Sequence, residues 1–337
     1  MKKNKILIVL ILAVLLLTGC TKQFKDADGK LVTVKETKQT LVSNVICKPK
    51  DLKEDYLKAF DKKEKALNKK YKAGDLSKKQ YNKSMKSLKA EMKKFDKLPS
   101  CSKFTPLSGG YETFWTTFFV KPLAWVIVKV GQLVGNIYGL SIILVTLIIK
   151  LILMPFSNSS LKQSEKMKSI QPKLDKIEKK YKNKTDQESM MMKSNEMMAL
   201  YKENGIKPLS GCLTAFIQLP LFFAFYEALY RLPIVFEGSF LGFKMGMTPL
   251  AGAESGAWYY LILPILVGLV TFFSFKMNKN TMSGDQQKSM NMMFNIMIVM
   301  IFITSFSMST AIIIYWIVNS AFTIIQNLIV KRSKAKW

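Results

Sequence analysis

Histidine is absent from this chain of 337 residues, and arginine occurs only at Arg231 and Arg332. Without histidine, no metal site, catalytic triad or proton relay that depends on an imidazole can form. The scarcity of arginine argues against DNA binding, because nucleic-acid sites favour arginine interleaved with aromatic residues. The sequence also has no Gly-rich phosphate loop, so we expect neither an ATP site, nor another cofactor, nor an enzymatic reaction.

Acidic residues are scarce as well, since 23 Asp and Glu stand against 51 Lys and Arg. The net charge of +28 coexists with 49% hydrophobic residues only because long apolar blocks alternate with lysine-rich blocks. That segregation is typical of a membrane protein with polar segments outside the bilayer. Membrane lipids with anionic headgroups, or ribosomal RNA close to the membrane, are the acidic neighbours we expect.

The start of the chain has the features of a signal for a bacterial lipoprotein. Lysines precede an apolar run over residues 6–17, which is too short to span a bilayer comfortably. Leu17-Thr18-Gly19-Cys20 resembles a lipobox, which predicts a signal peptide over 1–19 and diacylglyceryl and N-acyl lipid on Cys20. The alternative is an ordinary signal or anchor that ends in Cys. The lipoprotein interpretation places the following segment outside the cytoplasm, because paired acyl chains anchor it there.

Residues 20–110 form the predicted extracytoplasmic, lipid-anchored region, and lysine-rich residues 50–98 within it show two runs of helical periodicity. Between the runs we expect a turn at Ala73-Gly74, with Asp75 as the N-cap of the second helix. Cys47 and Cys101 flank this helical hairpin, whose two ends meet, so a disulfide between them is expected in an oxidising compartment. The alternative is that both cysteines are free thiols. The simplest interpretation of the lysines in this hairpin is that they form a solvated face.

Lys150 is the one full charge inside an apolar stretch, Tyr138 to Phe156, that is long enough to span a bilayer. We predict an interfacial helix over 111–136 and the first transmembrane span over 137–157. A buried lysine is costly, so Lys150 either snorkels to the nearby surface or faces a wet cavity with polar companions from other helices.

The remaining blocks complete an all-α membrane protein with five transmembrane helices, a cytoplasmic helical hairpin and an extracytoplasmic helical hairpin. The excess of lysine in segment 158–207 places it in the cytoplasm by the positive-inside rule. The predicted segments after it are a second span over 208–232, an extracytoplasmic loop over 233–257, a third span over 258–275, a cytoplasmic loop over 276–290, fourth and fifth spans over 291–330, and a cytoplasmic tail over 331–337.

The order of these segments resembles the YidC, Oxa and Alb family of membrane protein insertases, in its lipoprotein form from Gram-positive bacteria. Several local stretches carry the resemblance, which covers roughly residues 111–332 and leaves the hairpin at 50–98 without a counterpart. They are Tyr138-Gly139-Leu140-Ser141, Gln171-Pro172-Lys173, Pro208-Leu209-Ser210-Gly211-Cys212-Leu213, Gln218-Leu219-Pro220 and Ile314-Tyr315-Trp316-Ile317 with Asn319 and Gln326. The family usually has arginine where this chain has Lys150, which keeps the charge but loses the fork-shaped donor.

The resemblance implies that the chain is no enzyme but binds newly made membrane proteins in a positively charged hydrophilic groove and lets them leave into lipid. The residues that match this groove, or share its face, are Lys150, Thr146, Tyr315, Trp316, Gln218 and Asn319, with Gln326 a weaker candidate. A helix–helix hydrogen bond is the alternative role for the amides. Nascent membrane proteins are the expected partners of a monomer in the bacterial cell membrane, and the resemblance leaves the Sec translocon and the ribosome open as further partners.

Two other functions fit parts of the sequence. A transporter or channel could use Lys150 as an ion contact, but such proteins often consist of two similar halves, and the sequence shows no internal repeat. A structural lipoprotein could bind the anionic cell wall through residues 50–98, but Lys150 would then have no role.

Overall fold

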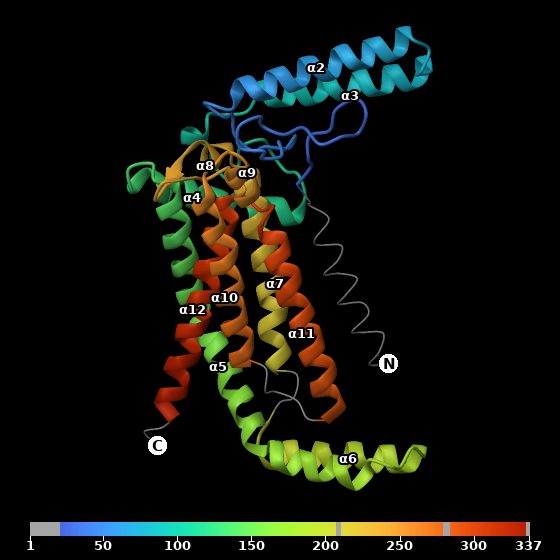
Figure 1. Cartoon of the computed structure of the whole chain (residues 1–337), viewed down its shortest axis with the longest axis vertical. Helices are drawn as coiled ribbons and strands as arrows, with labels where there is room; N and C mark the ends of the chain where they lie inside the picture. Colours follow the sequence, from blue (N-terminus) through green and yellow to red (C-terminus); the bar gives the residue numbers. More distant parts are fainter. Residues whose placement is uncertain (1–20, 207–209, 279–283, 335–337) are drawn as a thin grey trace. The chain divides into compact units, whose positions relative to one another are not determined.

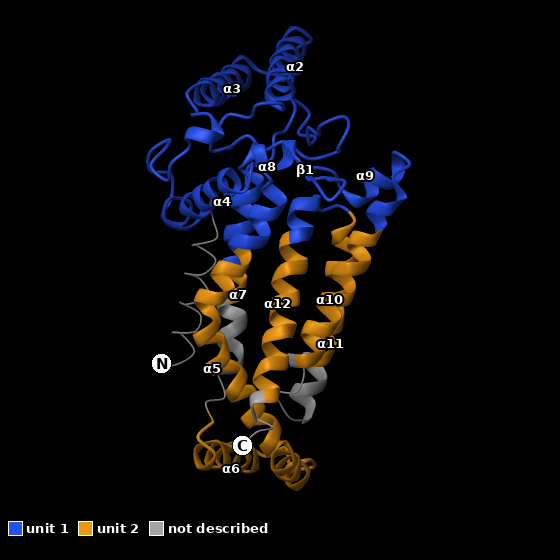
Figure 2. Ribbon diagram, turned by 90° about the vertical axis from the view of Figure 1, so that its left-hand side faces the viewer, with its two compact units in different colours: residues 1–145, 220–261, 307–314 blue, residues 146–219, 262–306, 315–337 orange. Residues whose placement is uncertain are grey.

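The structure, a computed structural model, describes the backbone of residues 21–206, 210–278 and 284–334, without the side chains at 210–217, 278, 284–290 and 333–334. The predicted signal peptide and the lipid-bearing Cys20 lie outside the described residues. The chain folds into two compact units, of which the first comprises residues 1–145, 220–261 and 307–314. The second comprises residues 146–219, 262–306 and 315–337, so the boundary falls within three long helices (Figure 2).

The first unit contains an antiparallel helical hairpin formed by α2 (Lys53–Lys72) and α3 (Lys78–Asp96) (Figure 1). Its core consists of one apolar face from each helix, with Phe60, Leu67, Leu88 and Phe95 almost fully buried. The predicted N-cap at Asp75 is wrong. Ser77 caps α3 instead, because its hydroxyl accepts from the Gln80 backbone N–H while the Gln80 side chain accepts from the Ser77 N–H.

Segment 21–49 covers one side of this hairpin. Its apolar residues Phe24, Leu41 and Val45 pack into the hairpin core, and short bridges such as Thr33 with Thr40 order its backbone. Further short elements of the first unit include η1 (Cys101–Lys103), the π-helical turn η2 (Thr116–Val120), α4 (Lys121–Leu133), α8 (Pro233–Glu237), β1 (Ser239–Phe240), β2 (Phe243–Lys244) and α9 (Pro249–Glu254). A methyl group at Gly139 would overlap the ring of Phe240, so only glycine fits there.

Helix α5 (Tyr138–Tyr181) is continuous through Pro155 and Pro172. The boundary predicted near residue 157 is therefore not a helix end, and the first span and the first arm of the hairpin at 158–207 belong to one helix. Each proline removes one backbone hydrogen bond, but α5 remains helical on both sides of Pro155 and Pro172. The second arm is α6 (Gln187–Glu203), which packs on α5 through Ile170, Leu174 and Leu200.

The remaining long helices occupy the apolar blocks that predict spans. They are α7 (Ser210–Tyr230), α10 (Ile262–Asn278), α11 (Gly284–Ser305) and α12 (Thr310–Lys334), with the short η3 (Trp258–Leu261) before α10. Among the residues that the structure describes, three helices are long and apolar enough to cross a membrane: Tyr138–Tyr181, Trp258–Met277 and Thr310–Arg332. A shorter apolar helix covers Asn291–Ser305. The all-α membrane fold class is confirmed, while the predicted domain boundaries stay predictions.

Candidate functional site

Lys150 lies in the apolar first part of α5 with only 9% of its surface exposed. Its ammonium group donates to the side-chain oxygen of Gln218 on α7 at 3.0 Å and to the hydroxyl of Thr323 on α12 at 3.4 Å. Gln218 in turn donates to the side-chain oxygen of Asn319 at 3.1 Å. These four residues, the Lys150 cluster, join three helices of the second unit.

The Lys150 cluster contains a cation but no anion. Among the described residues, no carboxylate forms an ion pair with Lys150, and its ammonium group donates to a neutral amide and a hydroxyl. Neutral oxygens satisfy the donor geometry of an ammonium group without cancelling its charge. The charge therefore remains available to an acidic group that enters the site, where low polarity strengthens the attraction.

The other sequence-predicted site residues are distributed around this cluster. Thr146 precedes Lys150 by one turn of α5 and is buried, as is Tyr315 on α12. Trp316 donates its indole N–H to the hydroxyl of Thr271 on α10 at 2.9 Å. Trp316 is thus hydrogen-bonded to α10. Of the predicted residues, Lys150, Gln218 and Asn319 are linked to one another by hydrogen bonds.

A second polar contact lies further along the same helices. The Gln326 amide donates to the Ser157 hydroxyl at 2.8 Å and to the Asn158 side-chain oxygen at 2.7 Å. Asn319, Thr323 and Gln326 follow one another at steps of four and three residues, which places them on one face of α12. Sequence reasoning missed Thr323, Ser157 and Asn158, although that spacing of polar residues within an apolar helix was the available signal.

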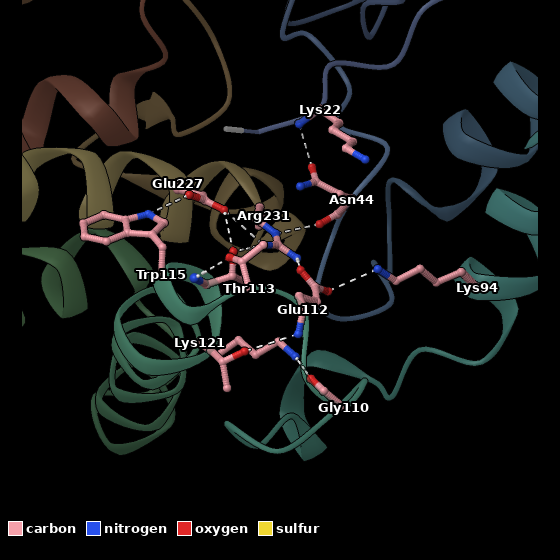
Figure 3. Close-up of polar contacts among 12 residues, drawn as sticks. Lys22, Asn44, Lys94, Gly110, Glu112, Thr113, Trp115, Lys121, Glu227 and Arg231 are labelled. Atoms are coloured by element: carbon pink, nitrogen blue, oxygen red, sulfur yellow. Dashed lines mark hydrogen bonds and ion pairs between the residues drawn. The ribbon is translucent and has the colours of Figure 1, made fainter. Parts of the chain in front are cut away.

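The first unit holds another buried charge cluster, which the sequence did not predict (Figure 3). Arg231 is fully buried, and its guanidinium donates to Glu112 at 2.7 Å and to Glu227 at 3.1 Å. It also donates to the backbone carbonyl of Asn44 at 2.7 Å, while the Trp115 indole donates to Glu227 at 3.0 Å. We call these residues the Arg231 cluster.

Electrostatics within the Arg231 cluster favour a charged Glu112. Burial alone would raise the pKa of Glu112, but the neighbouring charges of Arg231 and Lys94 outweigh burial and hold this pKa below its ordinary value. Nearby, burial lowers the pKa of Lys121, whose ammonium donates to the carbonyls of Ser108 and Gly110 at 2.9 and 2.6 Å. Because Lys94 also pairs with Glu112, at 3.1 Å, two cations balance the two carboxylates, which is the character of a structural site.

Cys47 and Cys101 form a disulfide in the structure, with their Cα atoms 4.8 Å apart. The pair joins the two ends of the α2–α3 hairpin, where the Lys48 N–H also donates to the carbonyl of Pro99 at 2.8 Å. Within the described part of the chain, no group of three or more Cys, Asp or Glu residues has the arrangement of a metal site.

Comparison with known proteins agrees with the sequence resemblance. The 60Kd inner membrane protein family matches residues 129–336 of this chain. The membrane protein insertase YidC of Oceanobacillus iheyensis is 36% identical over 241 residues, which cover 70% of this chain and 91% of that protein. MisCA, a membrane protein insertase of Bacillus subtilis, is 36% identical over 237 residues, with 69% and 86% covered. The YidC of Alkalihalophilus pseudofirmus is 38% identical over 224 residues, with 66% and 83% covered.

Proposed function

The chain belongs to the 60Kd inner membrane protein family, that of the YidC membrane protein insertases, and we propose that it inserts its clients at the Lys150 cluster. Insertion of newly made proteins into the membrane is the function that its relatives are named for. The observation that carries the proposal is a buried lysine, Lys150, whose hydrogen-bond partners are uncharged.

Insertion requires a polar or acidic flank of the client to cross an apolar layer, which is the costly step. In our proposal the Lys150 cluster lines a hydrophilic groove, which shortens the apolar layer that the flank must cross. The uncompensated ammonium then attracts acidic residues of the flank, and Gln218 and Asn319 offer exchangeable hydrogen bonds. The apolar segment of the client leaves sideways into lipid, where burial of its surface drives insertion.

We further propose that the chain crosses the membrane five times, beginning outside the cell and ending in the cytoplasm. The lysine-rich hairpin formed by α6 and the end of α5 would then lie in the cytoplasm, in agreement with the positive-inside rule. Cys20 would carry diacylglyceryl and N-acyl lipid on the opposite side of the bacterial cell membrane. The chain works as a monomer in this proposal, and the Sec translocon and the ribosome are partners to be tested.

Substitutions of Lys150 test the proposal directly. In cells depleted of their own insertase, Lys150→Arg should insert clients with acidic flanks like the wild type, because charge and reach are preserved. Lys150→Ala should fail with these clients, and Lys150→Glu should fail more severely because it repels them. The control clients have neutral flanks and are otherwise identical. Lys150→Ala and Lys150→Glu should insert these control clients far better than they insert the acidic clients.

Equal insertion of acidic clients by Lys150→Ala and wild type would contradict the proposed role of the charge. A lysine that only snorkels would give this result, since alanine removes an insertion penalty of about 2.5–3.5 kcal/mol. The rival function, a transporter or channel, predicts solute flux through vesicles that contain the purified protein, together with normal client insertion after depletion.

A further inference from the structure

One face of α3 carries five exposed lysines: Lys79, Lys83, Lys86, Lys89 and Lys93. Counted at 3.6 residues per turn, this α3 lysine face points away from the apolar seam formed by Met85, Leu88 and Phe95. No acidic residue in the described part of the chain forms an ion pair with any of the five. The face is therefore a row of uncompensated positive charge.

The partner helix α2 is equally rich in lysine, but three of its eight lysines form ion pairs. Lys58 pairs with Glu54 at 3.2 Å, Lys65 with Asp61 at 2.8 Å, and Lys70 with Asp28 at 2.6 Å. The two acidic residues of α3 form no ion pair with the α3 lysine face. One Glu91 oxygen is buried in the hairpin, and Asp96 lies at the helix end. Among the residues that the structure describes, the row of five lysines on α3 is thus free of ion pairs, whereas ion pairs interrupt the lysines of α2.

The α3 lysine face is not placed to rest on a bilayer. Segment 21–49 lies between the α2–α3 hairpin and α4 within the first unit (Figure 1). Exposed aromatic residues, typical of a membrane interface, lie beside α4 at Tyr111, Phe114 and Phe118. The side of this unit that suits lipid is thus separated from the lysines by a layer of protein.

We propose that the α3 lysine face binds a linear, phosphate-bearing polyanion. From Lys79 to Lys93 the helix extends about 21 Å, at 1.5 Å per residue, so several phosphates of one polymer can be contacted together. A single exposed lysine–phosphate contact contributes at most about 1 kcal/mol, but linked contacts reinforce one another and release counterions. The face contains no arginine or aromatic residue for reading bases, so phosphate contacts alone are expected.

This binding is separate from insertion, because the family match begins at residue 129, after the hairpin. Only the expected location of the polymer, outside the membrane, depends on the proposed topology. The binding itself can be measured without any client protein.

The test uses the full-length protein in nanodiscs of neutral phosphatidylcholine, with poly(glycerol phosphate) as the probe and glycerol phosphate as its monomeric counterpart. We expect the polymer to bind much more tightly than the monomer and to dissociate as salt is raised. Replacing the five lysines of the face by glutamine should weaken polymer binding by about tenfold or more. A matched control replaces the same number of lysines on α2, namely Lys58, Lys62, Lys65, Lys69 and Lys72, and should weaken it by less than about threefold.

A second measurement on the wild-type protein does not depend on the folding of any variant. Bound polymer should protect the five α3 lysines from an amine-reactive label more than the five α2 lysines. Equal protection of the two helices, equal loss of binding in the two variants, or no polymer binding would overturn the proposal. It would also be overturned if anionic lipid in the nanodisc, rather than the polymer, protected the α3 lysines.

Discussion

Two buried cations, Lys150 and Arg231, show how local partners decide whether a charge is available for function. Arg231 lies between Glu227 and Glu112, so its charge is cancelled where it stands. Lys150 has a neutral amide and a hydroxyl as partners, so its charge is solvated but not cancelled. We infer that Arg231 holds structure together, whereas Lys150 is free to attract an incoming anion.

The structural role of Arg231 leads to a stability prediction. Arg231→Gln leaves Glu227 buried without its cation, and removing one partner from a buried ion pair typically costs about 3–5 kcal/mol. Thermal unfolding in detergent should show a clearly lower midpoint for this variant. The control is Lys244→Gln, whose 3.5 Å pair with Glu36 has side chains 54% and 77% exposed, and its midpoint should hardly change. Similar midpoints for the two variants would contradict the assigned role.

The two clusters also differ in how far the sequence predicts them. Lys150 is conspicuous as a lone charge in an apolar stretch. Because a buried lysine needs polar neighbours, the sequence points to Gln218 and Asn319 as candidates. Arg231 sits at the end of an apolar block, where a basic residue is ordinary. Its partner Glu112 is 119 residues away along the chain, so only tertiary packing shows that the two meet.

At the scale of elements, periodicity predicts the helices well and their ends less well. The apolar seams of α2 and α3 indicate a hairpin because each helix has only one face to bury. We expect the first span to end near residue 157, where Pro155 and polar residues follow the apolar stretch, but the helix itself does not end there. The structure shows α5 continuing to Tyr181, a consequence of helix packing that local sequence does not contain.

The hairpin of α6 and the end of α5 should open more readily than the spans. Its core is small, with five buried residues, and several methionines of α6 are exposed, such as Met191 at 62%. Regions with few buried apolar contacts open at low free energy cost. Hydrogen exchange should therefore show the amides of α6 exchanging well before those of α10 and α12. Protection of α6 equal to that of these helices would show the prediction to be wrong.

The disulfide between Cys47 and Cys101 gives a second prediction about an element. These residues are 54 positions apart, and closing a loop of that length contributes about 4 kcal/mol by the chain-entropy estimate. Thiol labelling of the denatured, unreduced mature protein should leave both cysteines unmodified. Prior reduction should make both reactive, and Cys47→Ser should expose Cys101 to the label as a matched control. Labelling of both residues without reduction would disprove the pairing.

At the scale of the whole molecule, the two hairpins place separate requirements on the membrane topology. The α2–α3 hairpin needs an oxidising compartment for its disulfide, whereas the lysine-rich α6 hairpin fits the cytoplasm by the positive-inside rule. The proposed topology meets both requirements, because a single span, the first, would separate the two hairpins. Lys150 lies in this proposed first span, which would link the two sides of the membrane at this point of the chain.

Opposite locations for the two hairpins can be tested with single cysteines at exposed positions. Ser87→Cys on α3 and Asn195→Cys on α6 both place a thiol on a solvent-exposed helix face, in a Cys212→Ser background that removes the remaining free cysteine. In intact spheroplasts, a membrane-impermeant maleimide should modify the thiol at 87 and spare the one at 195. After permeabilisation it should modify both, which controls for intrinsic reactivity. Modification of both thiols in intact cells, or of neither, would place the two hairpins on the same side. The first span could then not cross the membrane, and Lys150 would lose its proposed place along the path of the client.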